Sequence, residues 1–489
     1  MKRTLLTLAV ASSFLCACTN KSANSGPWAE ADRIIAEMTK VSFPDRTVSI
    51  VDFGAVAGDS TKLAHEAINL AIVNTSLQGG GTVLVPDGVW YTGPITLKSN
   101  VNLHLSDNAT LKFVPDVDLY FPAVLTRWEG IDCNNTHPLI YAYGETNIAL
   151  TGKGTIDGGA NNTNWWARGR RTERRPFNVD PDDPKSEVRE GSRLRLLAWG
   201  ENNIPMHERV YTEVDGMRPQ TINFNRCKTV LIEDVTLLSS PFWVMHPLFC
   251  TDLTVRRVTV NNDGPNGDGC DPESCKNVLI EGCTFNTGDD CIAIKSGRNN
   301  DGRKWATPSE NIIVRDCIMA NGHGGVVIGS EISGGYRNLF VENCKMDSPN
   351  LERVIRIKTS TARGGLIENI YVRNVEVGEC REAVLRINLN YESNEPAQRG
   401  FIPEVRNVNL ENVTCNKSKY GVWLYGLDDQ TKISGVTLKD CKFEGVSTNG
   451  NFAHGLIGDI NFSNVTINGN VVAEDPFKAE SALSDGFSS

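Results

Sequence analysis

The sequence contains no apolar run long enough to cross a membrane. Its longest mainly apolar run covers residues 5–15, whereas a membrane-spanning helix needs about 20 residues. None of the 14 cysteines belongs to a CxxC pair, so a zinc site is not expected. Positive charge is also scarce, because 49 Lys and Arg face 59 Asp and Glu and give a net charge of −10. This balance does not favour nucleic acid as a partner.

The first residues have the pattern of an export signal. Two basic residues precede the apolar run, and Leu15-Cys16-Ala17-Cys18 at its end resembles the bacterial lipoprotein box, with Cys18 as the lipidated residue. We therefore expect a lipoprotein signal peptide over residues 1–18 and a tether and N-terminal segment over residues 19–47. The expected location is the periplasm or outer membrane, with membrane contact only through this anchor. The alternative is an ordinary cleaved signal peptide with two incidental cysteines.

One short pattern recurs from about residue 225 onward: alternating β-branched residues, a polar pair, then Val or Cys. Its copies end at Val235, Val258, Cys283, Cys317, Cys344, Val375, Val413, Cys441 and Val465. Successive copies end 23 to 38 residues apart, which is the period of a solenoid. Strand-only repeats of this length predict an all-β fold, a right-handed parallel β-helix over residues 48–470, with loops of variable length between the strands.

The open ends of a solenoid need to be covered. Asp59-Ser60-Thr61, followed by apolar residues at helical spacing, predicts a capped amphipathic helix over residues 63–73 that closes the N-terminal end. Residues 471–489 form a polar C-terminal tail.

The cysteines occupy equivalent positions of successive repeats. Three lie eight residues before the aligned position and four occupy it: Cys227, Cys250 and Cys275, then Cys283, Cys317, Cys344 and Cys441. Equivalent positions stack in a β-helix, so we predict ladders of small buried thiols in the core. An exported chain could also form one or two disulfides.

Three neighbouring repeats carry acidic residues or histidine between glycines. These segments are Gly267–Cys270, Gly288–Cys291 and Gly322–Gly325, and the strand Ile355–Lys358 continues the register of Ile292–Lys295 and Val326–Gly329. The expected register places Asp268, Asp289 and His323 in one column with Asp290 beside them. Neighbouring strands are about 4.8 Å apart, so the carboxylates are expected to lie close together.

Crowded carboxylates repel one another, and this raises at least one pKa. One acid then stays protonated while another stays ionised, which is the division that hydrolysis of a glycosidic bond requires. Taken singly, such residues are typical of turns or exposed strands, but their coincidence on consecutive coils favours a functional site. Calcium is a competing ligand for an acidic cluster. Arg356, Lys358 and a protonated His323 would repel it, so we expect no metal and no cofactor.

Together these segments resemble a known enzyme family. Asn266–Gly269, Gly288–Asp290, Gly322–Gly324 and Arg356–Lys358 resemble the four motifs of glycoside hydrolase family 28, the polygalacturonases. The resemblance extends over most of the predicted β-helix and departs from the family at Gly267, where Thr is usual. It implies a pectin-lyase-like solenoid that cleaves α-1,4-galacturonosidic bonds, with a pectic polysaccharide or an oligogalacturonide as substrate.

The resemblance also implies catalytic roles. Asp289 would be the general acid, and Asp268 and Asp290 would hold and activate the water, giving inversion; His323 would support the acid. Carboxyl groups about 5 Å apart are generally linked to retention and wider pairs to inversion. Strand spacing fixes backbones and not carboxyl oxygens, so we follow the family here.

The basic residues of the fourth motif explain how an acidic chain holds a polyanion, because positive charge is concentrated locally. Three further segments, Ser240–Pro247, Lys295–Arg298 and Gly329–Glu331, resemble the exo-acting bacterial branch of the family. With a weaker match at Tyr391, the expected substrate-binding residues are Arg356, Lys358, His246, Lys295, Arg298, Tyr391 and Trp243.

Residues 158–219 form a long polar insertion before the regular coils. It carries Trp165, Trp166 and the basic run Arg168, Arg170, Arg171, Arg174 and Arg175. We interpret it as a wall that closes one end of the cleft, with tryptophan stacked on sugar, which favours exo action; the alternative is a solvated loop. The other open functions are hydrolysis of rhamnogalacturonan or another pectic uronide, a calcium-dependent pectate lyase and a non-catalytic adhesin.

Overall fold

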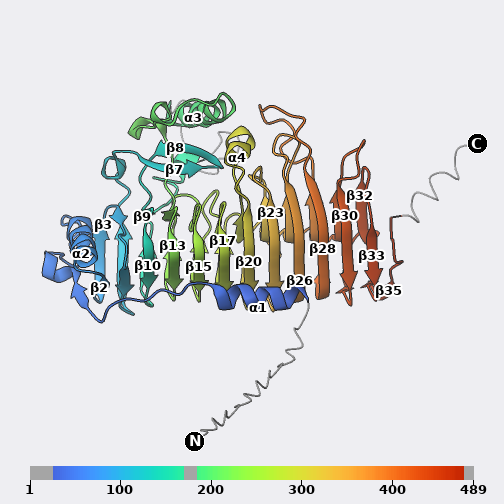
Figure 1. The fold of residues 1–489 in the computed structure, drawn as a ribbon, viewed down its shortest axis with the longest axis horizontal. Helices are drawn as coiled ribbons and strands as arrows, with labels where there is room; N and C mark the ends of the chain where they lie inside the picture. The colour runs from blue at the N-terminus through green and yellow to red at the C-terminus, as the bar shows by residue number, and fades with distance from the viewer. Residues whose placement is uncertain (1–25, 170–183, 478–489) are drawn as a thin grey trace, which may run out of the picture.

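The computed structural model describes residues 26–169 and 184–477. These residues form a parallel β-helix whose coils follow one another along a single axis in chain order (Figure 1). The predicted all-β parallel β-helix is therefore confirmed. Among the described helices, none is long and apolar enough to cross a membrane.

The strands stack in three columns. The first contains β1 (Thr47–Ser49), β2 (Gly81–Val85), β5 (Val101–Leu105), β10 (Thr146–Thr151), β13 (Lys228–Glu233), β15 (Thr251–Arg256), β17 (Lys276–Glu281), β20 (Ser309–Arg315), β23 (Tyr336–Glu342), β26 (Leu366–Glu379), β28 (Glu404–Lys417), β30 (Ile433–Lys439) and β33 (Ile460–Ser463). The second contains β3 (Gly88–Thr92), β6 (Ala109–Phe113), β11 (Thr155–Asp157), β14 (Thr236–Leu238), β16 (Thr259–Asn262), β18 (Thr284–Thr287), β21 (Ile318–Asn321), β24 (Lys345–Met346), the second halves of β26 and β28, β31 (Lys442–Phe443) and β34 (Thr466–Ile467), against which β35 (Asn470–Val471) runs antiparallel.

The third column carries the candidate site. It contains β4 (Ile95–Thr96), β9 (Ile140–Tyr143), β12 (Ile222–Asn225), β19 (Ile292–Ile294), β22 (Gly324–Gly329), β25 (Arg353–Lys358), β27 (Ala383–Asn388), β29 (Tyr420–Tyr425) and β32 (Asn451–His454). Single parallel bridges at Met245 and Cys270 connect β12 to β19. Short 3-10 helices lie between strands at η1 (Ile50–Phe53), η2 (Val117–Tyr120), η3 (Ala167–Gly169), η5 (Met206–Glu208) and η6 (Glu213–Asp215).

Side chains along each strand point alternately into and out of the coil, and the inward ones form the core. Val278 and Ile280 of β17 point inward and are fully buried, and Val255 and Ile312 stack above and below them. Each such side chain contributes about 1.5–3 kcal/mol by leaving water. The thiol ladders are also present: Cys250 contacts Cys275 in the next coil, and the twelve cysteines of the described residues are all buried and unpaired by disulfides.

A helix closes the N-terminal end as predicted. It is α2 (His65–Leu77), which buries Ile68, Ala71 and Ile72 against the first coils. The predicted cap was wrong, because the helix begins after Ala64 without a side-chain cap. Asp59 instead accepts hydrogen bonds from the backbone and hydroxyl of Thr61, which closes a turn before the helix starts.

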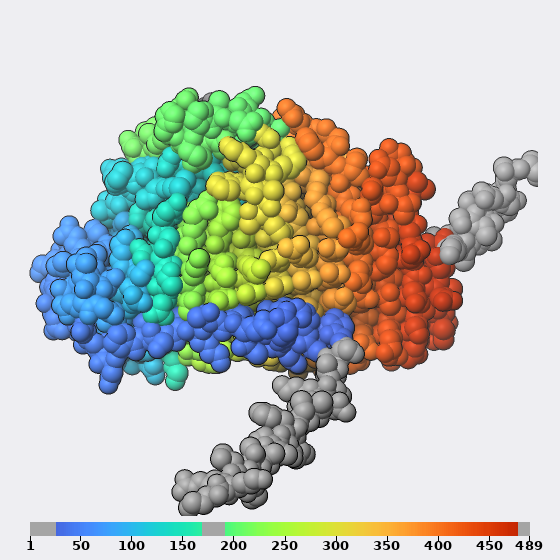
Figure 2. Space-filling view, in the orientation of Figure 1, coloured from blue at the N-terminus to red at the C-terminus, as the bar shows by residue number. Residues whose placement is uncertain are grey.

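The N-terminal segment runs along the side of the coils (Figure 2). Its helix α1 (Pro27–Glu37) packs onto outward-facing apolar residues of the first column, including Leu279, Ile313 and Phe340. Trp28 meets the Phe340 ring edge-on, with centroids 5.9 Å apart. The segment therefore covers apolar surface that the strand pattern leaves outside the core.

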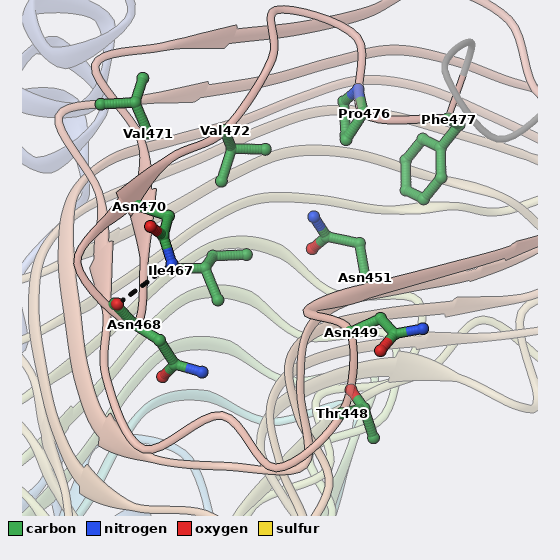
Figure 3. Close-up of a pocket in the computed structure, with 10 residues that line it drawn as sticks. All are labelled: Thr448, Asn449, Asn451, Ile467, Asn468, Asn470, Val471, Val472, Pro476 and Phe477. Carbon is green, nitrogen blue, oxygen red and sulfur yellow. Dashed lines mark hydrogen bonds between the residues drawn. The ribbon is translucent and has the colours of Figure 1, made fainter.

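The C-terminal end of the solenoid is hollowed (Figure 3). The hollow is lined by amide and apolar side chains, among them Asn451, Ile467, Asn470 and Phe477. None of its lining residues is ionisable, so it offers no acid–base chemistry.

The insertion and two neighbouring elements form a layer above the coils (Figure 1). Helix α3 (Pro184–Glu201) contacts α4 (Asn299–Trp305) and the antiparallel hairpin of β7 (Val124–Trp128) and β8 (Ile131–Asn135). The expected tryptophan stacking on sugar was wrong for Trp165, which is buried edge-on to Tyr120. Trp166 is half-buried and donates its indole N–H to the Ser240 carbonyl at 2.8 Å. Arg168 lies over the Trp165 ring, whereas Arg170, Arg171, Arg174 and Arg175 fall outside the described residues.

Candidate active site

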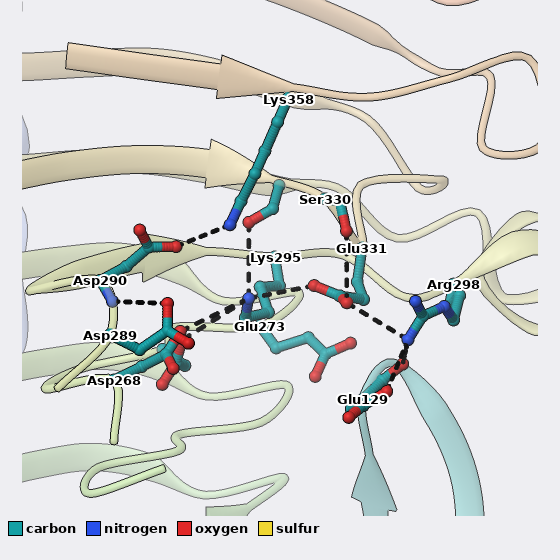
Figure 4. A network of polar contacts seen from close by, with 12 residues as sticks. Glu129, Asp268, Glu273, Asp289, Asp290, Lys295, Arg298, Ser330, Glu331 and Lys358 are labelled. Carbon is teal, nitrogen blue, oxygen red and sulfur yellow. Dashed lines mark hydrogen bonds and ion pairs between the residues drawn. The ribbon is translucent and has the colours of Figure 1, made fainter. Parts of the chain in front are cut away.

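Three carboxylates meet on the third column. One oxygen of each of Asp268, Asp289 and Asp290 can be chosen so that all three lie within 4.8 Å of one another. Asp268 and Asp290 are buried, while Asp289 is half-buried and lies at the mouth of the cluster. Figure 4 shows the three side chains converging from adjacent coils.

The predicted column was wrong by one residue on its first coil. Cys270 bridges Ile292, so Asp268, two residues earlier, is level with Asp290 and not with Asp289. Asp268 lies two positions before the paired Cys270, whereas Asp289 lies three positions before the paired Ile292. Aligning the two motifs does not reveal this difference of one residue. The remaining register is as predicted: Ile292 pairs with Val326, and Val326 with Ile355.

Asp290 is held by two cations. Lys358 Nζ lies 2.7 Å from one carboxylate oxygen and Arg356 Nη1 lies 3.2 Å from the other. Burial alone would raise the pKa of Asp290, but Lys358 and Arg356 outweigh it and lower the pKa well below its ordinary value. Asp290 is therefore ionised at neutral pH.

Asp268 has the opposite electrostatic environment. Burial, followed by the charges of Asp271 and Asp289, raises the pKa of Asp268 well above its ordinary value. Lys295, whose Nζ is 3.9 Å away, is the cation that pairs with Asp268 among the described residues. Neighbouring carboxyl groups thus differ in protonation, in agreement with the division expected from crowding.

His323 lies beside the exposed carboxylate. Its Nδ1 is 3.0 Å from Asp289 Oδ1, and roughly half of the side chain is exposed. The hydrogen bond to Asp289 raises the pKa of His323. His323 and Asp289 therefore form a pair at the surface of the cluster, above the buried Asp268 and Asp290.

The outer rim of the cluster is basic. Arg356 and Lys358 project from β25, and the ring centroid of Tyr391 lies 5.5 Å from the Arg356 guanidinium and 5.3 Å from Lys358 Nζ. The structure therefore brings together three of the residues that were expected to bind the substrate.

Other expected substrate-binding residues lie beneath the site. His246 is fully buried, with Nε2 2.8 Å from Glu273, and Arg298 is 1% exposed. The prediction that His246 and Arg298 contact the substrate directly was therefore wrong, because a sugar cannot reach buried side chains. Lys295 is buried under Trp243, whose ring centroid is 4.6 Å from Nζ, and lies 3.0 Å from Glu331. It can act only through its neighbours.

A buried ion network missed by sequence reasoning ties the surrounding loops together. Arg298 pairs with Glu129 of the β7–β8 turn and with Glu392 and Glu395 of the loop after β27. Arg363 binds the same two glutamates. The network fixes the loop that carries Tyr391. Its partners are far apart in the sequence, and no local motif marks them.

Asp271 was also missed. It is fully buried next to Asp268, and neither carboxylate oxygen has a hydrogen-bond partner among the described residues; Lys295 Nζ is 3.7 Å away. Burial raises the pKa of Asp271 well above its ordinary value, although Lys295 opposes the shift. Its position three residues after Asp268 was the available clue.

A parallel β-helix with clustered carboxylates and a basic rim defines the class of the protein: it has the acid–base groups of a polysaccharide-cleaving enzyme. A sequence model of the glycosyl hydrolases family 28 matches residues 211–455. The chain therefore belongs to glycosyl hydrolases family 28 and is a glycoside hydrolase.

Individual relatives agree with this assignment. The chain is 38% identical to a hyperthermoactive exopolygalacturonase from Thermotoga maritima of known structure, with a TM-score of 0.83 over 90% of this chain and 96% of that one. It is 29% identical to a probable polygalacturonase from Vitis vinifera, over 80% of this chain and 73% of that protein. It is 27% identical to an exo-poly-α-D-galacturonosidase from Dickeya chrysanthemi, over 71% of this chain and 58% of that protein.

Proposed function

We propose that the protein is an exo-acting polygalacturonase that removes galacturonate from the end of pectic chains or oligogalacturonides. The observation that carries the proposal is the carboxylate cluster with Asp290 held between Arg356 and Lys358. This arrangement joins acid–base groups to a site for an anionic sugar. The exo-acting relatives support cleavage at a chain end.

The proposed reaction is a single displacement with inversion. Asp289 gives its proton to the glycosidic oxygen, and the bond from that oxygen to the anomeric carbon breaks. Water held by Asp268 and Asp290 attacks the same carbon from the other side and loses one proton to a carboxylate. The products are one free galacturonate and a chain shortened by one residue. His323 supports Asp289, whose carboxyl group it contacts.

The test compares wild type with Asp289→Asn on polygalacturonate, rhamnogalacturonan and other pectic fractions. We expect Asp289→Asn to lower kcat by about 10²–10⁴-fold, because a general acid contributes that much. Asp440→Asn, at an exposed residue between β30 and β31, is the matched control and should keep full activity. Products are separated by size, and proton NMR of the first product reports inversion.

Each other function has its own outcome in this test. Early mid-chain cleavage with rapid loss of viscosity would show endo action, and turnover only on rhamnogalacturonan would show a different pectic substrate. Ultraviolet-absorbing products abolished by chelator would show a calcium-dependent lyase. Such an ion would have to displace Lys358 and Arg356 from Asp290. Glycan binding without turnover, unaffected by Asp289→Asn, would show an adhesin.

We further propose that the protein is an exported lipoprotein anchored through Cys18 and located in the periplasm or outer membrane. The motif that supports this proposal, residues 15–18, lies outside the described residues. In a bacterial host, the wild type should take up labelled palmitate and fractionate with membranes, whereas Cys18→Ser should do neither. Equal release of both forms as soluble protein would indicate an ordinary signal peptide.

A further inference from the structure

The outer face of the third column continues beyond the catalytic coils. Alternate residues of β25 point outward, and their register partners on β27, β29 and β32 do the same. One outward row contains Arg356, Arg386, Trp423 and Phe452, and the adjacent row contains Lys358, Asn388, Tyr425 and His454. The residues between the two rows, such as Ile387 and Leu424, are buried in the core. The basic rim of the site therefore leads directly onto this face.

The first coil of this extension is positively charged. Arg386 lies close enough to Arg353 and Arg356 for their charges to repel. Burial lowers the pKa of Arg386 to about 10, so it remains charged at neutral pH. Glu382 pairs with both Arg353 and Arg386, Glu352 pairs with Arg353 and Arg381, and Asp290 is shared by Arg356 and Lys358. These five cations therefore share three carboxylates, which leaves a net positive charge. Like charges gathered on an accessible face are stabilised by an anionic ligand.

The aromatic residues on the coils beyond Arg386 present ring edges, which also carry partial positive charge. The Arg386 guanidinium lies 4.2 Å from the Trp423 ring centroid, and Phe452 stacks at 5.1 Å with an 18° interplanar angle. These two neighbours come from the strands on either side of β29, so they cover opposite faces of the indole. The ring edge is therefore the accessible part, and aromatic edges carry partial positive charge.

We propose that Arg386, with Trp423, forms a further binding subsite for a carboxylate-bearing sugar of the bound chain. This inference rests on the proposed function, because it extends the same cleft. Arg386 is one coil, or about 4.8 Å, beyond Arg356. In the opposite direction, the β7–β8 hairpin and α3 stand over the coils (Figure 1). The substrate chain thus extends from the reacting end toward the C-terminal coils.

The test measures binding by calorimetry in an Asp289→Asn background, so that the ligand is not consumed. The probes are digalacturonate and tetragalacturonate. We expect the tetramer to bind more tightly than the dimer, and Arg386→Gln to weaken the tetramer about tenfold while changing the dimer less than twofold. Trp423→Phe keeps the ring but removes the indole N–H, and should weaken only the tetramer. Arg406→Gln, an exposed arginine on the first column, is the matched control.

Two results would overturn the subsite: equal weakening of dimer and tetramer by Arg386→Gln, or no weakening of either. Turnover by the wild-type enzyme is measured in parallel on the same oligomers. If the wild type hydrolyses the oligomers but Arg386→Gln does not weaken tetramer binding, the proposed subsite is wrong and the proposed function stands. If the tetramer depends on Arg386 but no oligomer is hydrolysed, the subsite stands and the proposed function is wrong.

Discussion

At the scale of single residues, the site divides its carboxyl groups by environment. Asp290 lies between Lys358 and Arg356 and stays ionised, whereas burial favours the protonated form of Asp268. The residue types alone predicted that crowding would separate the pKa values. They could not show which carboxylate would be ionised, because that depends on which side chains each one meets across the coils.

The ion pair at Asp290 predicts a shift in the pH profile. Lys358→Met removes the nearer cation, so the pKa of Asp290 should rise and the acid limb of kcat/KM should move up by about one pH unit or more. The lowered pKa also stabilises the fold above the pKa of the unfolded chain, and this contribution is lost as pH falls through the folded value. Lys358→Met should therefore be less stable than wild type mainly above about pH 4.

The measurements are the pH dependence of kcat/KM and thermal unfolding at several pH values. Lys439→Met, an exposed lysine on the first column, is the control and should leave the acid limb in place. A rise in KM with an unmoved acid limb would mean that Lys358 only binds substrate.

At the scale of elements, long-range ion pairs hold the layer above the coils. Arg298 connects the β7–β8 hairpin, the start of α4 and the loop after β27, three segments from distant parts of the chain. The same loop reaches α3, where the backbone N–H of Gln398 donates to Glu201. The insertion is therefore one part of a composite layer, and sequence analysis identified only that part.

Arg298→Met should destabilise the protein by about 3–5 kcal/mol, because it breaks a buried ion network and leaves Arg363 alone to neutralise Glu392 and Glu395. It should also raise KM, since the loop carrying Tyr391 loses its attachment. Thermal unfolding and steady-state kinetics on the same preparation provide the check. Arg406→Gln, an exposed arginine, should change neither quantity appreciably. Unchanged stability of Arg298→Met would show that the network does not hold this layer.

At the scale of the whole molecule, one periodic pattern produces the solenoid, and local additions close its surfaces. Helix α2 covers the first coils, and α1 covers the outward apolar residues of β17, β20 and β23. Helix α1 was not expected as part of the fold, although residues such as Leu279 and Phe340 break the outward polar pattern and are the clue in the sequence. The layer above the coils then borders one side of the site, while the third column runs on past β25.

The sequence by itself determined the parallel coils, the thiol ladders and the family motifs, because inward alternation and repeat position depend only on neighbouring residues. Tertiary structure decided that Asp268 is level with Asp290, that His246 and Arg298 lie beneath the cleft, and that Trp165 belongs to the core. These outcomes depend on loop length and on burial by distant segments. The carboxylate cluster was therefore predictable as a set of residues, but its register and its ionised member were not.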